Sequence, residues 1–210
     1  MKVILASTSP RRIDLMTQAR IPVQVISPDC EEIVRRGETP SQMVRRLAIE
    51  KAESVACSKM LLGKQVIIIS ADTTVVAPGG KRILGKPLHA RDAERMLKWI
   101  SGKTHEVLTG YCLLSLDTQG RRTLFSRVVR SRVTMRSVSS AMIREYIASG
   151  EPMDKAGAYA AQGFGMNWIQ SIRGSYTNVV GLPMCELLTD LEEKFRVTPV
   201  SSGKRSRRRL

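Results

Sequence analysis

The chain of 210 residues has few aromatic side chains, no long apolar run and no closely spaced cysteines. Aromatic residues make up only 4% of it, so its core must rest mainly on valine, isoleucine, leucine, methionine and alanine. No apolar stretch approaches the about 20 residues that a membrane-spanning helix needs. The apolar segment near the N-terminus is also shorter than that of a signal peptide. These absences predict a cytoplasmic protein that makes no contact with a membrane.

The cysteine pattern disfavours a zinc site. No two cysteines form a Cys-x-x-Cys pair, and the four are widely scattered: Cys30, Cys57, Cys112 and Cys185. Only two histidines are present, which also disfavours a catalytic cysteine with a histidine partner. We therefore expect reduced thiols that are mostly buried.

Acidic residues are also few, since 34 lysines and arginines face 19 aspartates and glutamates, for a net charge of +15. This excess favours anionic ligands, either nucleic acid or nucleotide phosphates. Part of it lies in residues 199–210, a basic tail without apolar periodicity that we predict to be disordered. The tail could contact a polyanion weakly or simply solubilise the chain. Residues 1–198 are predicted to form the one folded domain.

The first stretch with a chemical signature is Ala6 to Arg12, Ala-Ser-Thr-Ser-Pro-Arg-Arg. It follows an apolar run, Val3 to Leu5, that reads as a buried strand, and it precedes an amphipathic helix. A loop that enters a helix presents free backbone N–H groups, and two guanidinium groups beside them favour phosphate binding. A capped helix with solvated arginines explains the stretch equally well.

Two further segments place charged side chains in apolar surroundings. A helix is predicted from Thr39 or Ser41 to about Ser58, and Lys51 falls on its apolar stripe, where it must snorkel, pair or enter a cleft. The most strand-like run, residues 66–69, ends in Ser-Ala-Asp-Thr-Thr, so Asp72 is predicted at the end of a buried central strand. Open α/β sheets carry their chemistry at such positions.

Other segments carry weaker signals. The acidic run at residues 29–32 is either a set of solvated carboxylates or a source of metal ligands. Gly85-Lys86-Pro87 presents an exposed lysine on a rigid turn. Ser101-Gly102-Lys103-Thr104 follows a helix and lacks the first glycine of a P-loop, so we reject that interpretation. Near the C-terminus, Gly174-Ser175-Tyr176 is predicted to form a turn.

Several motifs together resemble one known family. In order along the chain they are Ala6-Ser7-Thr8-Ser9-Pro10-Arg11-Arg12, Glu50-Lys51-Ala52, Ser70-Ala71-Asp72-Thr73, Gly85-Lys86-Pro87, Ser101-Gly102-Lys103-Thr104-His105, Asp154-Lys155-Ala156-Gly157-Ala158-Tyr159, Gln162-Gly163 and residues 174–183. The set resembles the Maf family of nucleoside triphosphate pyrophosphatases over residues 2–195.

The resemblance implies an α/β fold, an elongated mixed sheet with flanking helices and two lobes around a cleft, as in the inosine triphosphate pyrophosphatases. It implies hydrolysis between the α- and β-phosphates with a divalent cation, Mg²⁺ or Mn²⁺. Asp72 corresponds to the proton acceptor, and Glu32 is the natural second carboxylate for the metal. The residues expected around the triphosphate are Ser7, Arg11, Arg12, Lys51 and Lys86. A homodimer would suit the family.

The choice of substrate rests on fewer residues. Members that act on dTTP and UTP resemble this chain at Arg12, Thr73 and Gln162, whereas the 7-methyl-GTP branch usually has a tryptophan before the paired arginines. A glutamine amide donates and accepts together, which suits a pyrimidine edge. Ala160-Ala161 departs from the bulkier residues common there and could loosen the base pocket. The alternatives are the 7-methyl-GTP activity and a non-catalytic nucleotide- or nucleic-acid-binding regulator of cell division.

Overall fold

A computed structural model describes residues 1–80 and 82–197, so the predicted tail at 199–210 lies outside the described residues. The strands among them are β1 (Lys2–Ala6), β2 (Gln24–Val25), β3 (Val66–Val76), β4 (Ile83–Leu84), β5 (Thr104–Leu116), β6 (Arg122–Met135) and β7 (Ile169–Arg173). The α-helices are α1 (Pro10–Gln18), α2 (Pro40–Ala56), α3 (Ala90–Ile100), α4 (Ser140–Ala148), α5 (Tyr176–Val180) and α6 (Met184–Phe195).

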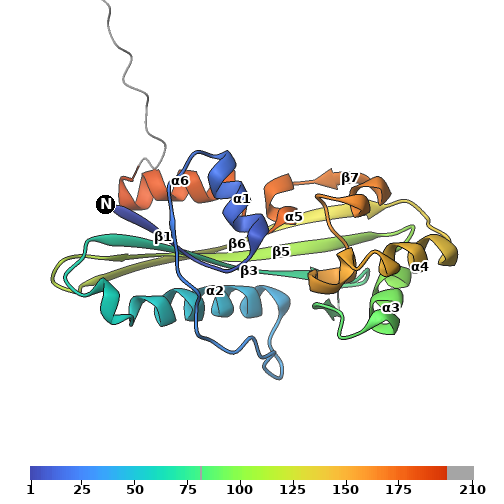
Figure 1. Cartoon of the computed structure of the whole chain (residues 1–210), viewed down its shortest axis with the longest axis horizontal. Helices are drawn as coiled ribbons and strands as arrows, with labels where there is room; N and C mark the ends of the chain where they lie inside the picture. The colour runs from blue at the N-terminus through green and yellow to red at the C-terminus, as the bar shows by residue number, and fades with distance from the viewer. Residues whose placement is uncertain (81, 198–210) are drawn as a thin grey trace, which may run out of the picture.

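The strands form a single mixed sheet in the order β2-β1-β3-β5-β6-β7, with β4 paired to β3. β1 is parallel to both β2 and β3, and the remaining pairs are antiparallel. Figure 1 shows an elongated sheet with α2 along one face, α1, α5 and α6 along the other, and α3 and α4 at one end. The predicted mixed α/β sheet with flanking helices is confirmed.

The central strand β3 is longer than the sequence predicts. It runs from Val66 to Val76, and Asp72 lies within it, so the prediction that Asp72 ends the strand is wrong. The reason is that β5 pairs with β3 along its whole length, whereas β1 pairs with it only as far as Ser70. β4 joins the same edge again only at Val75. Asp72 therefore lies on a stretch of strand whose one edge is open.

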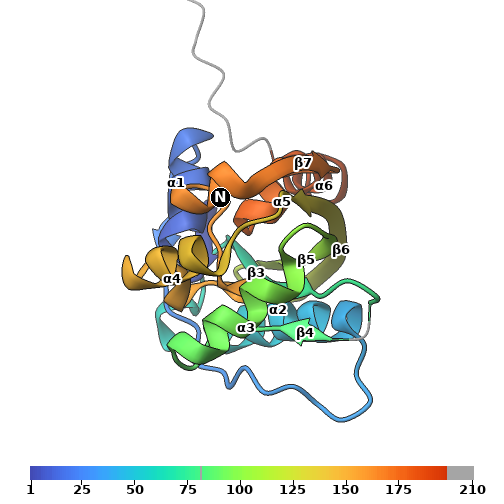
Figure 2. The same ribbon diagram turned by 90° about the vertical axis from the view of Figure 1, so that its right-hand side faces the viewer.

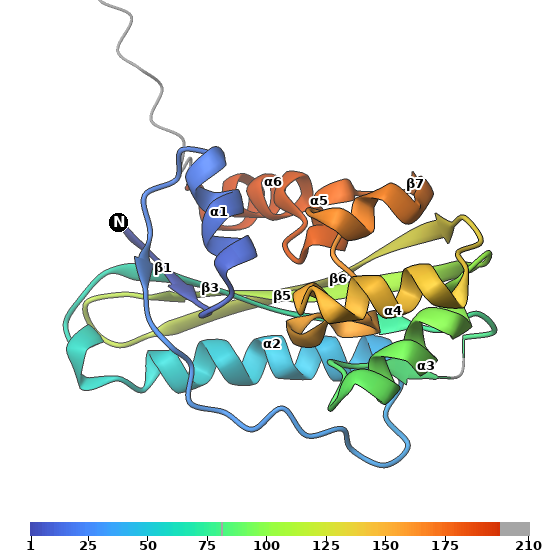
Figure 3. The same cartoon turned by 45° about the vertical axis from the view of Figure 1, so that its right-hand side comes forward.

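Helix α2 runs along one face of the sheet, below β3 and β5 in the view of Figure 3. Its N-cap is Thr39, which forms a reciprocal capping box with Gln42. Gly110 on β5 faces the helix, and a Cβ there would lie 2.4 Å from the Val44 carbonyl oxygen. Because Gly110 is the register partner of Asp72, this close approach brings α2 directly against the Asp72 position.

The apolar core is divided along the length of the sheet. One cluster lies between the sheet and helices α1 and α6, and a second lies between the sheet and α2. A third occupies the far end, near α3 and α4 (Figure 2), where the glycine-rich segment of residues 154–165 packs close to Tyr146 and Trp168. Among residues 1–80 and 82–197, no helix combines the length and the apolar character that crossing a bilayer demands.

The segment after β7 differs from its prediction. Gly174-Ser175-Tyr176 was expected to form only a turn, but Ser175 caps the short helix α5, and its Oγ accepts a hydrogen bond of 3.2 Å from the Asn178 N–H. Five residues are too few to show helical periodicity, and two of them are valines, which favour strands. No periodic pattern in the sequence therefore predicts this helix.

Candidate active site

The predicted site residues surround one cleft at the open edge of β3. A cavity of about 330 Å³ adjoins a smaller hollow of about 200 Å³ beside the loop that enters α1. Of the predicted residues, those that line both are Arg11, Arg12, Glu32, Lys51 and Lys86; Asp72, Thr73 and Gln162 line the larger one and Ser7 the smaller. The structure thus brings all nine together.

The cleft has two walls because consecutive residues of a strand point to opposite faces of the sheet. Asp72 points toward α2 and Thr73 toward α5, yet both reach the cleft, since no strand among the described residues pairs with that edge of β3 between Ser70 and Val75. We call Glu32, Lys51 and Asp72 the α2 wall. Arg12, Thr73 and Gly181 form the α5 wall.

The α2 wall is an ion triad centred on Lys51. Its Nζ lies 2.6 Å from Asp72 Oδ1 and 2.6 Å from Glu32 Oε1. Lys51 and Asp72 are buried, whereas Glu32 is half exposed. Burial acts to raise the pKa of Glu32, but the hydrogen bond and charge of Lys51, with Lys86 and Arg12 nearby, lower it overall. Of the outcomes open to Lys51, the structure shows pairing at the cleft.

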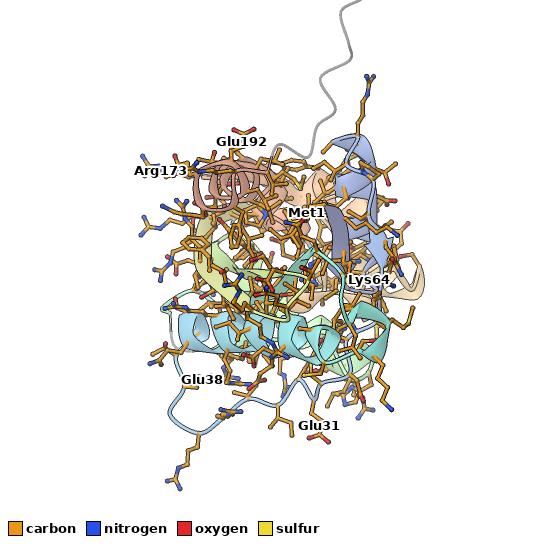
Figure 4. All side chains as sticks on the ribbon, turned by 90° about the vertical axis from the view of Figure 1, so that its left-hand side faces the viewer. Met1, Glu31, Glu38, Lys64, Arg173 and Glu192 are labelled. Atoms are coloured by element: carbon orange, nitrogen blue, oxygen red, sulfur yellow. The ribbon has the colours of Figure 1, made fainter. Side chains whose placement is uncertain are left out.

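The loop that carries Glu32 is fastened to α2. Arg46 donates to the Ile33 carbonyl oxygen at 2.9 Å, to both oxygens of Glu38 at 2.7 Å, and to Glu50 at 2.9 Å. Figure 4 shows Glu31 and Glu38 on this loop, on the outer side of α2 and away from Arg173 and Glu192. Arg46 therefore fixes the backbone next to Glu32.

The α5 wall holds a cation with neutral oxygens only. Arg12 donates from Nε to the Gly181 carbonyl oxygen at 2.8 Å, from Nη1 to Ser7 Oγ at 3.3 Å, and from Nη2 to Thr73 Oγ1 at 3.0 Å. Burial lowers the pKa of Arg12, while the charges of Asp72 and Glu32 act in the opposite direction. Its position is fixed, but no carboxylate pairs with its charge among the residues described.

Two cleft residues had been missed in the sequence. Asp154 Oδ2 lies 3.2 Å from Arg11 Nη1, which joins the loop before α1 to the glycine-rich segment, and Lys155 donates to the Glu151 carbonyl oxygen at 2.8 Å. Both residues belong to the motif that begins at Asp154, but nothing in its spacing indicates a partner 143 residues away.

Lys86 is exposed and makes no ion pair within the described part of the chain.

The segment that carries Gln162 is held by Glu151. Its carboxylate accepts from the Phe164 N–H at 3.0 Å, the Gly165 N–H at 3.2 Å and the Tyr146 hydroxyl at 2.7 Å. Burial acts to raise the pKa of Glu151, but these hydrogen bonds lower it overall. Gln162 is half buried at the cleft beside Ala160 and Ala161, and its amide makes no side-chain hydrogen bond across residues 1–80 and 82–197.

The α2 wall suits a divalent cation that a substrate would complete. Within the described ranges, no three histidine, cysteine, aspartate or glutamate side chains are grouped to hold a metal by themselves. Two carboxylates, Glu32 and Asp72, nevertheless converge on one point, the Nζ of Lys51. Mg²⁺ is usually bound through one or two carboxylates together with phosphate oxygens and water. The two carboxylates therefore fit a divalent cation such as Mg²⁺ when a phosphate is also bound.

Comparison with known proteins gives a consistent result. The family model described as Maf-like protein matches residues 2–194. A protein of Geotalea uraniireducens named dTTP/UTP pyrophosphatase is 46% identical over 189 residues, 90% of this chain and 93% of its own. One of Syntrophus aciditrophicus with the same name is 43% identical over 197 residues, 94% and 92% of the two chains. The solved dITP/XTP pyrophosphatase of Mycobacterium abscessus covers 96% of this chain and 98% of its own, with a TM-score of 0.37 and 13% identity.

Proposed function

Because the chain belongs to the Maf family, whose model spans residues 2–194, we propose that it hydrolyses dTTP and UTP to the monophosphate and pyrophosphate. The names of relatives that are 41–46% identical over most of its length support this substrate class. The observation that carries the proposal is the pairing of the two walls. An ion triad of two carboxylates and one lysine faces a fixed guanidinium whose charge has no carboxylate partner among the described residues.

The phosphate groups would occupy the hollow beside the loop that enters α1. Four cations line it with Ser7, namely Arg11, Arg12, Lys51 and Lys86, so a triphosphate there would meet these charges beside the carboxylates of Glu32 and Asp154. Arg11 and Lys86 are placed to hold the departing pyrophosphate, because neither is buried in the core. Arg12, joined to both Ser7 and Thr73, lies between the phosphates and the base.

The proposed chemistry begins at Asp72. Its Oδ1 is bound by Lys51, whereas its Oδ2 has no hydrogen-bond partner among the described residues. Oδ2 can accept a proton from a water that attacks the α-phosphorus, and the bond to the bridging oxygen of pyrophosphate then breaks. Lys51 fixes the carboxylate for this step. Glu32 and Asp72 would hold a divalent cation, Mg²⁺ or Mn²⁺, which neutralises phosphate charge when bound.

The test is a pyrophosphate-release assay with dTTP, UTP, CTP and 7-methyl-GTP, with Mg²⁺, with Mn²⁺ and with a chelator. We expect turnover of dTTP and UTP that the chelator abolishes. Asp72→Asn keeps the side-chain volume and should lower kcat by about 10²–10⁴-fold, the usual contribution of a general base. Asp117→Asn, in the exposed turn after β5, is the matched control and should behave as the parent.

Three results would count against the proposal. Turnover of 7-methyl-GTP alone would favour the other branch of the family. No turnover at all would favour a non-catalytic nucleotide- or nucleic-acid-binding regulator. An Asp72→Asn variant as active as the parent would overturn the chemistry proposed for Asp72. Light scattering tests the proposed homodimer, and removal of residues 201–210 tests whether the tail contacts a polyanion.

A further inference from the structure

A buried chain of hydroxyl groups runs behind the α5 wall. Arg12 Nη2 lies 3.0 Å from Thr73 Oγ1, which lies 2.9 Å from Thr109 Oγ1, and Thr109 donates to the Asn178 carbonyl oxygen at 3.0 Å. Thr73 and Thr109 are direct register partners on β3 and β5. Thr109 is fully buried, and it touches the cleft only through Thr73.

The groups at the two ends of this row of hydroxyls, a guanidinium and a carbonyl oxygen, set the direction in which each hydroxyl donates. A guanidinium can only donate, a carbonyl oxygen can only accept, and each threonine has a single proton. Since Thr109 gives its proton to Asn178, Thr73 gives its proton to Thr109 and accepts from Arg12. The Gly181 carbonyl oxygen is a second acceptor for the Thr73 proton, but at 3.3 Å it lies farther away than Thr109 Oγ1 at 2.9 Å.

Further hydrogen bonds hold the far end of this row of hydroxyl groups, at Asn178. The Asn178 side chain is fully buried and donates to the Val107 carbonyl oxygen at 3.1 Å and to Ser131 Oγ at 2.9 Å. Ser131 in turn donates to the Ser175 carbonyl oxygen at 2.8 Å. The helix α5 backbone that receives the Thr109 proton is therefore tied to β5 and β6.

The consequence at the cleft is a fixed pattern of donors and acceptors. Thr73 directs its proton inward and presents a lone pair, while Arg12 presents its remaining N–H groups. Uracil and thymine carry an N–H donor beside a carbonyl acceptor, and cytosine carries the reverse, a ring-nitrogen acceptor beside an amino donor. With Thr73 facing the ring nitrogen of the base, a locked Thr73 accepts from the uracil or thymine N–H and offers no proton to the cytosine nitrogen.

Resting on the function proposed above, we propose that Thr109 is a positioning residue for base selection. Its hydroxyl locks the Thr73 hydroxyl as an acceptor and holds the Arg12–Thr73 corner for a uracil- or thymine-like edge. Thr109 itself does not touch the substrate. The test is therefore a ratio between two substrates, since general damage to the fold lowers both activities together.

The experiment measures kcat/KM for UTP and CTP with the full-length chain. Thr109→Val keeps the shape and removes the hydroxyl, and the UTP:CTP ratio should fall about tenfold, the effect of one hydrogen bond. Thr109→Ser restores the hydroxyl and should keep the parent ratio. The matched control is Thr104→Val, because Thr104 Oγ1 contacts its cross-strand partner Thr134 Oγ1 at the same 2.9 Å, away from the cleft.

A folded Thr109→Val variant with the parent ratio overturns the proposal. If that variant does not fold, as judged by its thermal unfolding, Thr109→Ala decides by the same ratio. The dissociation constants of α,β-imido-UTP and α,β-imido-CTP, measured by calorimetry, give the selectivity without hydrolysis. A parent chain that binds the UTP analogue selectively but hydrolyses nothing contradicts the proposed function and leaves the positioning role measurable.

Discussion

The two walls of the cleft place a cation in the interior in different ways. On the α2 wall, Lys51 is bound by two carboxylates, each at 2.6 Å. On the α5 wall, Arg12 is bound by a carbonyl oxygen and two hydroxyls, none of which carries a charge. We call the first cation balanced because it contacts two carboxylates. We call the second unbalanced because it contacts no carboxylate among the described residues, although the charges of Asp72 and Glu32 act on it from a distance.

The difference separates a reacting side from a binding side. A buried carboxylate is costly unless it is paired, and Lys51 pairs with Asp72 and holds it in place. An unbalanced guanidinium gains most from an anionic ligand, and a phosphate supplies one. The α2 wall therefore suits proton transfer, and the α5 wall suits recognition of the nucleotide.

Removing each cation in turn tests this difference between the two walls most directly. Lys51→Met should lower the free energy of unfolding by about 3 kcal/mol, because a buried carboxylate loses its partner. Arg12→Met should cost only about 1 kcal/mol, since its neutral acceptors can turn to water in the cleft. Urea unfolding measures both losses of stability. The KM for UTP should rise in Arg12→Met, although this variant loses little stability.

Lys98→Met is the control for the loss of a lysine, because Lys98 forms an exposed i,i+4 pair with Glu94. Such pairs contribute about 0.3–0.5 kcal/mol. Equal losses of stability in Lys51→Met and Arg12→Met would contradict the division into a balanced and an unbalanced wall.

Much of the α2 wall could be predicted from the sequence. Lys51 stood out because a lysine on an apolar helical stripe needs a partner, and Asp72 because it interrupts a buried apolar run. Both signals lie within one element each. The family resemblance then supplied the link between segments that are distant in the chain.

The support of the α5 wall could not be predicted in the same way. Thr109 is an ordinary threonine in a strand, and only the register of β3 with β5 places it opposite Thr73. Asn178 lies in a helix of five residues, too short for a periodic pattern. Hydrogen bonds that cross 36 and 69 positions of sequence are set by tertiary packing. No local pattern encodes them.

A smaller effect is expected from the contact that brings α2 to the sheet. Gly110→Ala would place a methyl group 2.4 Å from the Val44 carbonyl oxygen, so the helix must move away and carry Lys51 with it. We expect a loss of about 2 kcal/mol in unfolding free energy and a lower kcat for UTP. Gly85→Ala is the control for stability, because a Cβ there meets nothing within 4 Å. A Gly110→Ala variant of parental stability would show that α2 can shift freely.

The smallest effect concerns Glu32, the half-exposed member of the α2 wall. Its pKa is lowered in the folded chain, so it contributes stability above its ordinary value of about 4.3, and that contribution is lost as the pH falls through the lower folded value. The thermal midpoints of the parent and Glu32→Gln should therefore differ above the ordinary pKa of about 4.3 and converge as the pH falls below it and through the lower folded value. Glu31→Gln, a neighbouring exposed carboxylate, should follow the parent throughout. A gap for Glu32→Gln that stays constant with pH would mean that Lys51 is balanced by Asp72 alone, and the α2 wall would then be a pair.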